Sequence, residues 1–422
     1  MQWRTGVVGR WVRGVWDPAV LPAAAVAIVV ALGFGLLVPV LPIYARSFGG
    51  AAWQVGLVVT AFAAMRLVSD VPAGWLVDRI GSARAVALGC AIVAVSSAAA
   101  GLAPTYEWLV ALRGGGGIGS ALFSAGLTAY LLAAVPRERM GRAMSLFNGS
   151  FLAGSAFGPT VGGLAAGVLG LRGPFFLYAG FCTAAAVVAL WTLKPIPRHS
   201  RQAGHHAAAA AAPLRFSPVL AAALTSGFAQ WWLLGGFRFT LVPLYAAEAL
   251  GLDASAIGLG LTASALGNLG VLAPAGAAAD RYGRRAVGVP AFVGLALSVG
   301  ALLLADGLMG YVMASALFGA LAGATSVIPG ALLADAVARS LPDTTRQTPA
   351  MAGTGGGVRG IAAGWQQTAN DLGNFVAPVA IGLAVDLAGY PPAVVVAVLP
   401  ALVAAALMAT IRAPRAATVP VR

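Results

Sequence analysis

The sequence predicts an all-α membrane protein in which twelve transmembrane helices form two pseudo-symmetric six-helix halves. The first observation behind this prediction is composition: of 422 residues, 59% are hydrophobic and only 9% are charged, whereas soluble domains carry about 25% charged residues. The second is the recurrence of apolar runs of about 20 residues, the length that crosses a bilayer. The third is a set of motifs that appear once in each half of the chain, which indicates an internal duplication.

The apolar runs define the individual spans. We place them at residues 19–44, 55–77, 85–103, 108–135, 143–168, 174–193, 219–246, 256–279, 286–304, 308–337, 360–387 and 391–411. This division predicts an N-terminal half at residues 1–193, a cytoplasmic linker at 194–217 and a C-terminal half at 218–422. The linker contains His199, His205 and His206 beside a run of alanines. Histidines so close together can bind a metal, but a low-complexity linker is the interpretation that we favour.

The loops on the two sides of the predicted membrane differ in charge. Most arginines and the one lysine, Lys194, fall in the loops of one side, which also carries both termini. The loops of the other side contain only Arg46 and Arg172 as basic residues. Because basic loops remain on the cytoplasmic side, we expect a multi-pass protein of the inner or plasma membrane with both termini in the cytoplasm.

A charged turn that follows the second span recurs after the eighth. Its sequence is GWLVDRIG at residues 74–81 and GAAADRYG at residues 276–283. The first glycine lets a neighbouring helix approach closely, and the last can take the positive φ of a tight reversal. The Asp-Arg pair offers a carboxylate to a helix N-terminus and a guanidinium to carbonyl or carboxylate groups. The predicted gating residues are Gly74, Asp78, Arg79, Gly81, Asp280, Arg281 and Gly283.

Further anchors relate the two halves. PIYA at residues 42–45 matches PLYA at 243–246, and GL at 56–57 matches GL at 258–259. In the fifth span, glycines surround a proline, and the eleventh span carries a weaker copy around Pro378. Small residues allow close packing and a proline bends the helix, which suits a helix that pivots against the other half; an ordinary packing face is the alternative. The motif residues are Gly154, Gly158, Pro159, Gly162 and Gly163.

These motifs together resemble those of the major facilitator superfamily. The two charged turns resemble its loop 2–3 and loop 8–9 signatures, and the fifth-span motif resembles that of its twelve-helix drug:proton antiporter group. GFGLLVPVLP at residues 33–42 resembles another element of that group, and RGGGGIG at 113–119 resembles the motif whose arginine is thought to assist proton transfer. The chain departs from the pattern at Ser82 and Ala83, where the family usually has a basic pair, and in having no acid in the first span.

Ionisable side chains inside the bilayer cost roughly 2.5–3.5 kcal/mol each at mid-helix, so each requires a reason. We identify five in the predicted spans: Arg66, Asp70, Arg113, Arg238 and Asp371. All of them fall in spans two, four, seven and eleven, whereas the third, sixth, ninth and twelfth spans, which lie outside the cavity in this fold, contain none. We take Asp70, Asp371, Arg113 and Arg66 as candidates for proton coupling.

Two carboxylates therefore carry the coupling hypothesis. Asp70 lies about 12 Å deeper than Asp78 along its helix and one turn from Arg66; it is either a proton-binding carboxylate tuned by that arginine, or half of a neutralising pair. Asp371 lies about 17 Å from the cytoplasmic end of its helix, and the equivalent position in the other half is Leu152. It either binds a proton or substrate, or pairs with Arg113 or Arg238 for structural reasons.

The predicted substrate contacts come from polar and aromatic residues near the middle of the membrane. Arg238 is expected either to bind an anionic group or to pair with Asp371, and aromatic residues nearby either line an apolar pocket or face lipid. The predicted substrate-binding residues are Arg238, Trp231, Gln367, Asn370 and Phe34.

The resemblance implies a secondary active transporter that exports small apolar or cationic organic compounds in exchange for protons by alternating access. The sequence has no G-x-x-x-x-G-K-[ST] motif for ATP, so the energy source is a gradient. It also offers no nucleophile–base set or metal-ligand set, so we expect no enzyme activity, cofactor or metal. The expected partners are substrate, protons and the bilayer, not nucleic acid, and we expect a monomer.

Two alternatives remain open at this point. One is a proton-coupled carrier of an anionic metabolite, with Arg113 and Arg238 binding its carboxylate. The other is a transport-inactive sensor with the same fold.

Overall fold

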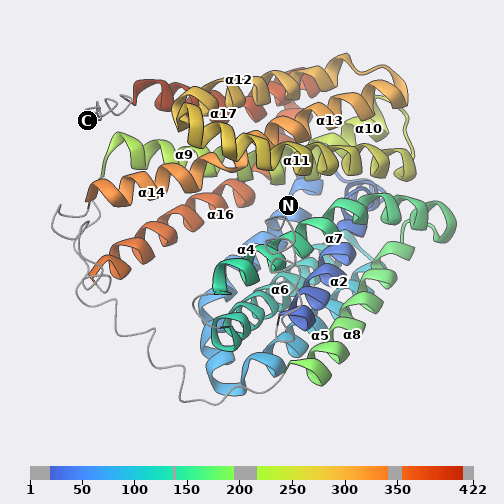
Figure 1. The fold of residues 1–422 in the computed structure, drawn as a ribbon. Helices are drawn as coiled ribbons and strands as arrows, with labels where there is room; N and C mark the ends of the chain where they lie inside the picture. Colours follow the sequence, from blue (N-terminus) through green and yellow to red (C-terminus); the bar gives the residue numbers. More distant parts are fainter. Residues whose placement is uncertain (1–19, 136–138, 194–215, 341–353, 412–422) are drawn as a thin grey trace, which may run out of the picture.

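The computed structural model describes residues 20–135, 139–193, 216–340 and 354–411, and every regular element in these ranges is a helix. The helices form two bundles, coloured blue to green and yellow-green to red in Figure 1. Within the described ranges, ten helices are long and apolar enough to cross a membrane, and two further spans are interrupted along their length. The predicted membrane fold is confirmed. Residues 194–215 of the expected linker, including its histidines, lie outside the described residues.

The N-terminal bundle begins with an interrupted span, α2 (Leu21–Leu37) and α3 (Leu41–Arg46). The break falls at Pro39, which has no amide hydrogen with which to continue the helix. The other five spans are α4 (Ala52–Ile80), α5 (Ser82–Gly101), α6 (Tyr106–Ala134), α7 (Met140–Leu169) and α8 (Gly173–Thr192).

The C-terminal bundle also begins with an interrupted span, α9 (Pro218–Trp232), η4 (Leu233–Leu241) and α10 (Val242–Glu248). The η4 segment is a π-helix, in which the Thr240 hydroxyl donates a hydrogen bond to the Gly235 carbonyl (3.1 Å). The remaining spans are α11 (Ala254–Tyr282), α12 (Arg284–Ala301) with η5 (Leu302–Leu304), α13 (Gly307–Ser326) with α14 (Ile328–Ser340), α16 (Thr354–Ala388) and α17 (Tyr390–Thr410).

The two charged turns have the same geometry. Gly81 ends α4 with a φ of 92°, and Gly283 ends α11 with a φ of 91°. Side chains rarely tolerate this backbone region, which explains why glycine occupies both positions.

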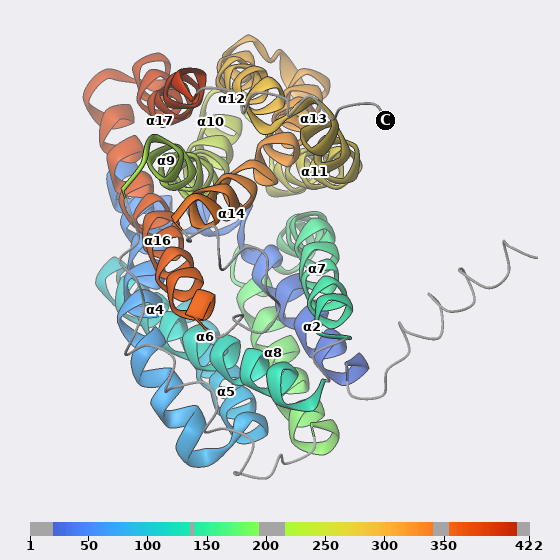
Figure 2. The ribbon, with the colours of Figure 1, turned by 60° about the vertical axis from the view of Figure 1, so that its left-hand side comes forward.

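The most extensive contacts between the bundles are made by two helix pairs. Figure 2 shows α16 beside α4, and α7 beside α11. In each pair, one helix carries a charged turn at its C-terminal end and the other carries a glycine–proline motif. The pairs are related by the internal repeat, because Gly56 of α4 corresponds to Gly258 of α11, and Pro159 of α7 to Pro378 of α16. The candidate site lies along these two crossings.

Candidate functional site

At both crossings, a glycine of one half packs directly against a proline carbonyl of the other half. A Cβ atom on Gly56 would lie 2.1 Å from the Pro378 carbonyl oxygen, and one on Gly258 would lie 2.3 Å from the Pro159 carbonyl oxygen. No side chain fits at such distances, so both crossings depend on glycine at these positions. The two halves therefore pack against each other at positions where their sequences match.

Threonines reinforce both crossings one helical turn further along. The Thr60 hydroxyl donates to the Phe375 carbonyl across the α4–α16 contact (2.8 Å). The Thr262 hydroxyl donates to the Ala156 carbonyl across the α11–α7 contact (2.9 Å). A neutral hydroxyl satisfied by a backbone carbonyl joins helices without placing a charge in the membrane.

The fifth-span motif packs in two directions. Gly154, Gly158 and Gly162 lie against α2 of their own half, and a Cβ on Gly162 would lie 2.1 Å from the Leu36 carbonyl oxygen. Gly163 instead faces the other half, where a Cβ would lie 2.3 Å from the Ala254 carbonyl oxygen. Pro159 belongs to this second face. Most of the motif thus packs within its own half, and Pro159 and Gly163 make the contact with the opposite half that the sequence predicted.

Charged residues connect the two bundles at the end where α3 and α10 lie. Arg46 of α3 donates through Nε to Glu248 Oε1 of α10 (2.6 Å), and the Tyr390 hydroxyl donates to Glu248 Oε2 (2.6 Å). The hydrogen bond with Glu248 raises the pKa of Arg46 above its ordinary value. One carboxylate therefore connects the first spans of both halves to the last span.

Asp386 makes a second polar contact across the halves. Its two carboxylate oxygens accept hydrogen bonds from the backbone amides of Ala52 and Trp53, each 2.8 Å long, at the N-terminus of α4. The first amides of a helix have no partner within the helix, and the helix dipole favours an anion there. We call the end of the molecule that carries Arg46, Glu248 and Asp386 the contact end.

The opposite end, which carries Gly81 and Gly283, is more accessible. The N-terminal half of α16 is largely exposed from residue 361 to residue 368, whereas its C-terminal half packs against α4. Likewise α4 is mostly exposed from Met65 to Val71 but buried from residue 52 to residue 62 at most positions. We call this end the open end. The halves converge at one end and expose their facing helices at the other.

The two predicted proton-coupling carboxylates lie within electrostatic range of one another at the open end. Asp70 of α4 is exposed and interacts electrostatically with Arg66 on its own helix and with Asp371 on α16. Asp371 is partly buried and accepts a hydrogen bond from the Gln367 side chain (2.9 Å). The structure thus brings together Asp70, Asp371, Arg66 and Gln367 from both halves. The neighbouring Asn370 accepts a hydrogen bond from Gln366 (3.1 Å).

Arg113 and Arg238 do not belong to this group, which corrects the alternative in which either pairs with Asp371. Arg113 is 3% exposed and its guanidinium lies over the Phe62 ring, 4.8 Å from the centroid, inside the N-terminal half. Arg238 points into the C-terminal half, where Nη2 donates to the Leu261 carbonyl (3.4 Å). Neither guanidinium forms an ion pair with a carboxylate in the described residues.

The predicted aromatic and gating residues are spread over the structure. Phe34 contacts Phe62 and Phe239 near the middle of the molecule, whereas Trp231 is a partly buried residue of α9. The gating residues lie at the open end, where Asp78, Arg79, Asp280 and Arg281 are exposed and Gly74 is partly exposed. Arg284, next to the second turn, pairs with Asp335 of α14 within the same half.

Sequence reasoning missed Glu248 and Asp386 as contacts between the halves. The contact becomes evident only in the structure, where Asp386 lies one helical turn beyond Gly382 and a Cβ on Gly382 would lie 2.5 Å from the Ala52 carbonyl oxygen.

Comparison with known proteins agrees with this architecture. The family model described as Major Facilitator Superfamily matches residues 23–241 and again residues 232–421. Two solved structures share the fold: the nucleoside transporter NupG (TM-score 0.72, 13% identity, covering 93% of this chain and 100% of that one) and a bacterial homologue of the human lysosomal transporter Spinster in an inward-facing and occupied conformation (TM-score 0.67, 15% identity, covering 92% and 95%). At these identities the likeness concerns the fold alone.

Curated relatives match over a shorter length. Multidrug resistance protein 2 of Bacillus subtilis is 31% identical over 163 residues, covering 39% of this chain and 40% of that protein. Quinolone resistance protein NorA of Staphylococcus aureus is 27% identical over 173 residues, covering 41% and 44%. The alignments thus span about two fifths of these relatives. Because the family model matches nearly the whole chain, the protein belongs to the Major Facilitator Superfamily of membrane transporters.

Proposed function

We propose that the protein exports small organic compounds in exchange for protons, with the breadth of a multidrug transporter. The observation that carries this proposal is the electrostatic interaction of Asp70 with Asp371, one from each half, at the open end. Protonation of one carboxyl removes the repulsion between the two. The approach of the halves at this end is thereby coupled to the binding of a proton, as an antiporter requires.

The direction of transport is inferred from topology. The open end carries the loops in which arginine is concentrated, so the positive-inside rule places it in the cytoplasm together with both termini. The described conformation then faces inward, with Arg46, Glu248 and Asp386 closing the outer side. The names of the curated relatives, which refer to multidrug and quinolone resistance, support export.

The anionic-metabolite alternative loses its binding residues in this arrangement. It requires Arg113 and Arg238 to meet at one carboxylate, but Arg113 lies over Phe62 of the N-terminal half and Arg238 donates to the Leu261 carbonyl of the C-terminal half. The acids Asp70 and Asp371 instead face the opening, where they favour a cation or a neutral compound.

Transport in inverted membrane vesicles tests the proposal. After respiration has acidified the vesicle interior, addition of a transported compound dissipates the pH gradient, and the initial rate reports coupling. We expect Asp70→Asn and Asp371→Asn each to abolish gradient-driven transport while leaving the folded protein in the membrane. The matched control is Asp306→Asn, which removes an exposed carboxylate from a loop at the contact end.

If both variants keep the full coupled rate, the carboxylates are not the proton site. If no compound from a broad panel dissipates the gradient but an organic acid is taken up, the anionic carrier is the correct function. If nothing is transported in either direction, the transport-inactive sensor is correct.

A further inference from the structure

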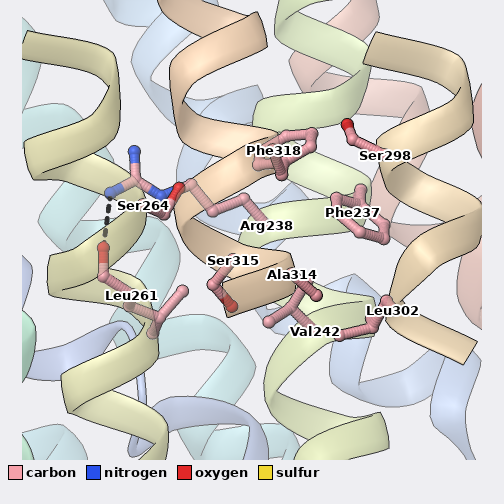
Figure 3. A pocket seen from close by; sticks show the side chains of 10 residues that line it. All are labelled: Phe237, Arg238, Val242, Leu261, Ser264, Ser298, Leu302, Ala314, Ser315 and Phe318. Carbon is pink, nitrogen blue, oxygen red and sulfur yellow. Dashed lines mark hydrogen bonds between the residues drawn. The ribbon is translucent and has the colours of Figure 1, made fainter. Parts of the chain in front are cut away.

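Two cavities in the described residues differ greatly in size. Figure 3 shows the smaller one inside the C-terminal half, surrounded by side chains that include Phe237, Arg238 and Phe318. Its volume of about 10 Å³ is close to the least that holds one water molecule. The larger one lies at the contact end and has a volume of about 470 Å³. Sites for small molecules and cofactors occupy about 300–1,000 Å³, so the larger cavity has room for a ligand.

The larger cavity, which we call the corner cavity, is formed by the N-terminal half alone. Its lining residues are Tyr44, Ser47, Phe48 and residues 169–172. The Tyr44 ring contacts the Phe48 ring with centroids 5.3 Å apart, and its hydroxyl donates to the Gly101 carbonyl of α5 (3.3 Å). One wall is therefore held by aromatic packing and a buried hydrogen bond, and the loop between α7 and α8 forms the other.

The internal repeat places an equivalent loop in the C-terminal half. The match between the two glycine–proline motifs extends to Gly170 and Gly389, which both follow a long helix. Their φ values are 73° and 81°, so the two loops turn in the same way. The next residue differs, because Leu171 follows the first glycine and Tyr390 follows the second.

In the C-terminal half, a tyrosine and a carboxylate occupy this place. The Tyr390 ring packs edge-to-face on Tyr245 with centroids 5.1 Å apart, and its hydroxyl donates to Glu248 Oε2 (2.6 Å). The N-terminal half lacks both the large ring and the acidic group, which accounts for the open space there. The residues equivalent to Tyr245, Glu248 and Tyr390 are Tyr44, Ser47 and Leu171.

A cationic group lines the corner cavity instead of an acidic one. Arg172 is exposed and forms no ion pair with a carboxylate in the described ranges. The other basic residue of the loops at the contact end, Arg46, is already paired with Glu248. Helix α8 begins at Gly173, and the dipole at a helix N-terminus also favours an anion. The electrostatics of the cavity therefore favour a negatively charged ligand.

An exposed apolar face of α7 leads up to the corner cavity. Leu164 and Val168 lie one helical turn apart and are 57% and 85% exposed, and Leu169, which lines the cavity, is 57% exposed. In a membrane protein such a face contacts acyl chains. The loop that carries Arg172 joins two spans and therefore lies near the membrane surface. A ligand with an anionic headgroup and acyl chains matches both surfaces.

We propose that the corner cavity binds the phosphate-bearing headgroup of an anionic phospholipid from the leaflet at the contact end. Arg172 contacts the phosphate, and an acyl chain follows the exposed face of α7. Basic pockets at the membrane surface bind lipid headgroups in this way. The inference is independent of the proposed function, because none of the lining residues is a candidate for proton coupling or substrate binding.

Binding of two lipids that differ only in the headgroup tests the charge. Phosphatidylglycerol and phosphatidylcholine with identical acyl chains are titrated into the purified full-length protein in detergent, and native mass spectrometry gives their dissociation constants. We expect phosphatidylglycerol to bind more tightly. Arg172→Gln should weaken its binding by about 5-fold, the effect of one cationic residue near a membrane surface, and leave phosphatidylcholine unchanged. Arg172→Lys should keep the preference.

A photoreactive analogue of each lipid tests the location. Cross-linked peptides of the wild-type protein, identified by mass spectrometry, should contain residues 47–48 or 169–172. Leu171→Tyr places at this loop the side chain that occupies the equivalent position of the C-terminal half. We expect it to reduce cross-linking of both lipids there, because it fills the cavity without removing the charge. Arg84→Gln, which removes an exposed arginine of α5 at the open end, is the control.

Three outcomes would overturn the inference. Equal weakening of phosphatidylglycerol binding by Arg172→Gln and Arg84→Gln would show that overall charge, not the corner cavity, attracts the lipid. Cross-links confined to other parts of the wild-type protein would place the lipid elsewhere. Displacement of phosphatidylglycerol by an equal concentration of glycerol phosphate would show that the occupant is a soluble phosphate compound rather than a lipid.

Discussion

The two crossings between the halves have the same packing and different charges. Both use a glycine against a proline carbonyl, a threonine bonded to a backbone carbonyl, and a second glycine against the start of a helix. The α4–α16 crossing also carries Arg66, Asp70, Asp371 and Asp386. The equivalent positions of the α11–α7 crossing are Asn268, Leu272, Leu152 and Gly167. One crossing is charged along its whole length, and these four positions of the other are neutral.

This difference separates two tasks of the duplicated fold. Rocking of the halves needs two equivalent hinges, so close packing is required on both sides of the approximate symmetry axis. Proton exchange needs one carboxylate site, and a second copy would add the cost of further charges in the membrane. We infer that both crossings serve as hinges and that the charged crossing also senses the proton.

The largest effect is expected from replacing the glycine that packs against a proline carbonyl at each crossing. Gly56→Val and Gly258→Val each force a branched side chain against a proline carbonyl, and overpacking costs about 1–3 kcal/mol or more. We expect both to open the contact end and to shift the conformational equilibrium by about 5- to 150-fold. Spin labels on Ser47→Cys and Ala249→Cys report the separation of α3 and α10, and the native Cys90 and Cys182 are buried.

The same experiment tests whether the two crossings are equivalent hinges. Gly180→Val is the control, because a Cβ there meets no atom within 4 Å. If Gly56→Val widens the label distance and Gly258→Val does not, the crossings are not equivalent hinges.

A smaller effect is expected from the carboxylate that distinguishes the crossings at the contact end. Asp386→Asn weakens two charge-assisted hydrogen bonds to the start of α4, worth about 1.5–3 kcal/mol to a charged group. We expect it to favour opening of the contact end. The converse change, Gly167→Asp, places a carboxylate at the equivalent position near Ser255, where a Cβ has only the serine hydroxyl at 3.4 Å.

Gly167→Asp should therefore lock the contact end more firmly and slow transport, and it should partly restore closure to Asp386→Asn. The same label pair measures both results. Failure of Gly167→Asp to shorten the distance in the Asp386→Asn background would show that the two helix starts do not accept an anion equally.

Much of the fold, including the spans and the crossings between the halves, was predictable from the sequence. The spans follow from apolar length, and the contacts of Gly56, Gly258 and Pro159 coincide with the positions at which the two halves match. The directions of Arg113 and Arg238 were not predictable. Their helices are apolar on nearly every face, so hydrophobic periodicity does not fix the rotation of the helix, and a mid-span arginine can point into the cavity or into its own half.

The partners of Asp386 and Glu248 were hidden for a different reason. The internal repeat shows that α4 corresponds to α11 and α7 to α16, but it gives no information on which of these helices are in contact. Contacts between residues more than 200 positions apart, such as Arg46 with Glu248, depend on that packing. Charge patterning alone places such acids in loops.

The smallest effect is expected at the Arg46–Glu248 pair, which lies near the symmetry axis at the contact end. Arg46 sits one position from the residue equivalent to Glu248, so the pair can be reversed with little change in geometry. Its side chains are 36% and 32% exposed, and exposed pairs contribute about 0.2–1 kcal/mol.

Arg46→Glu should widen the label distance slightly, because two carboxylates then face each other. The double variant Arg46→Glu/Glu248→Arg should recover most of the closure, but not the hydrogen bond from Tyr390. If the double variant stays as open as the single one, the contact depends on Tyr390 and Gly50, whose carbonyl accepts from Arg46 (2.5 Å), more than on the opposite charges.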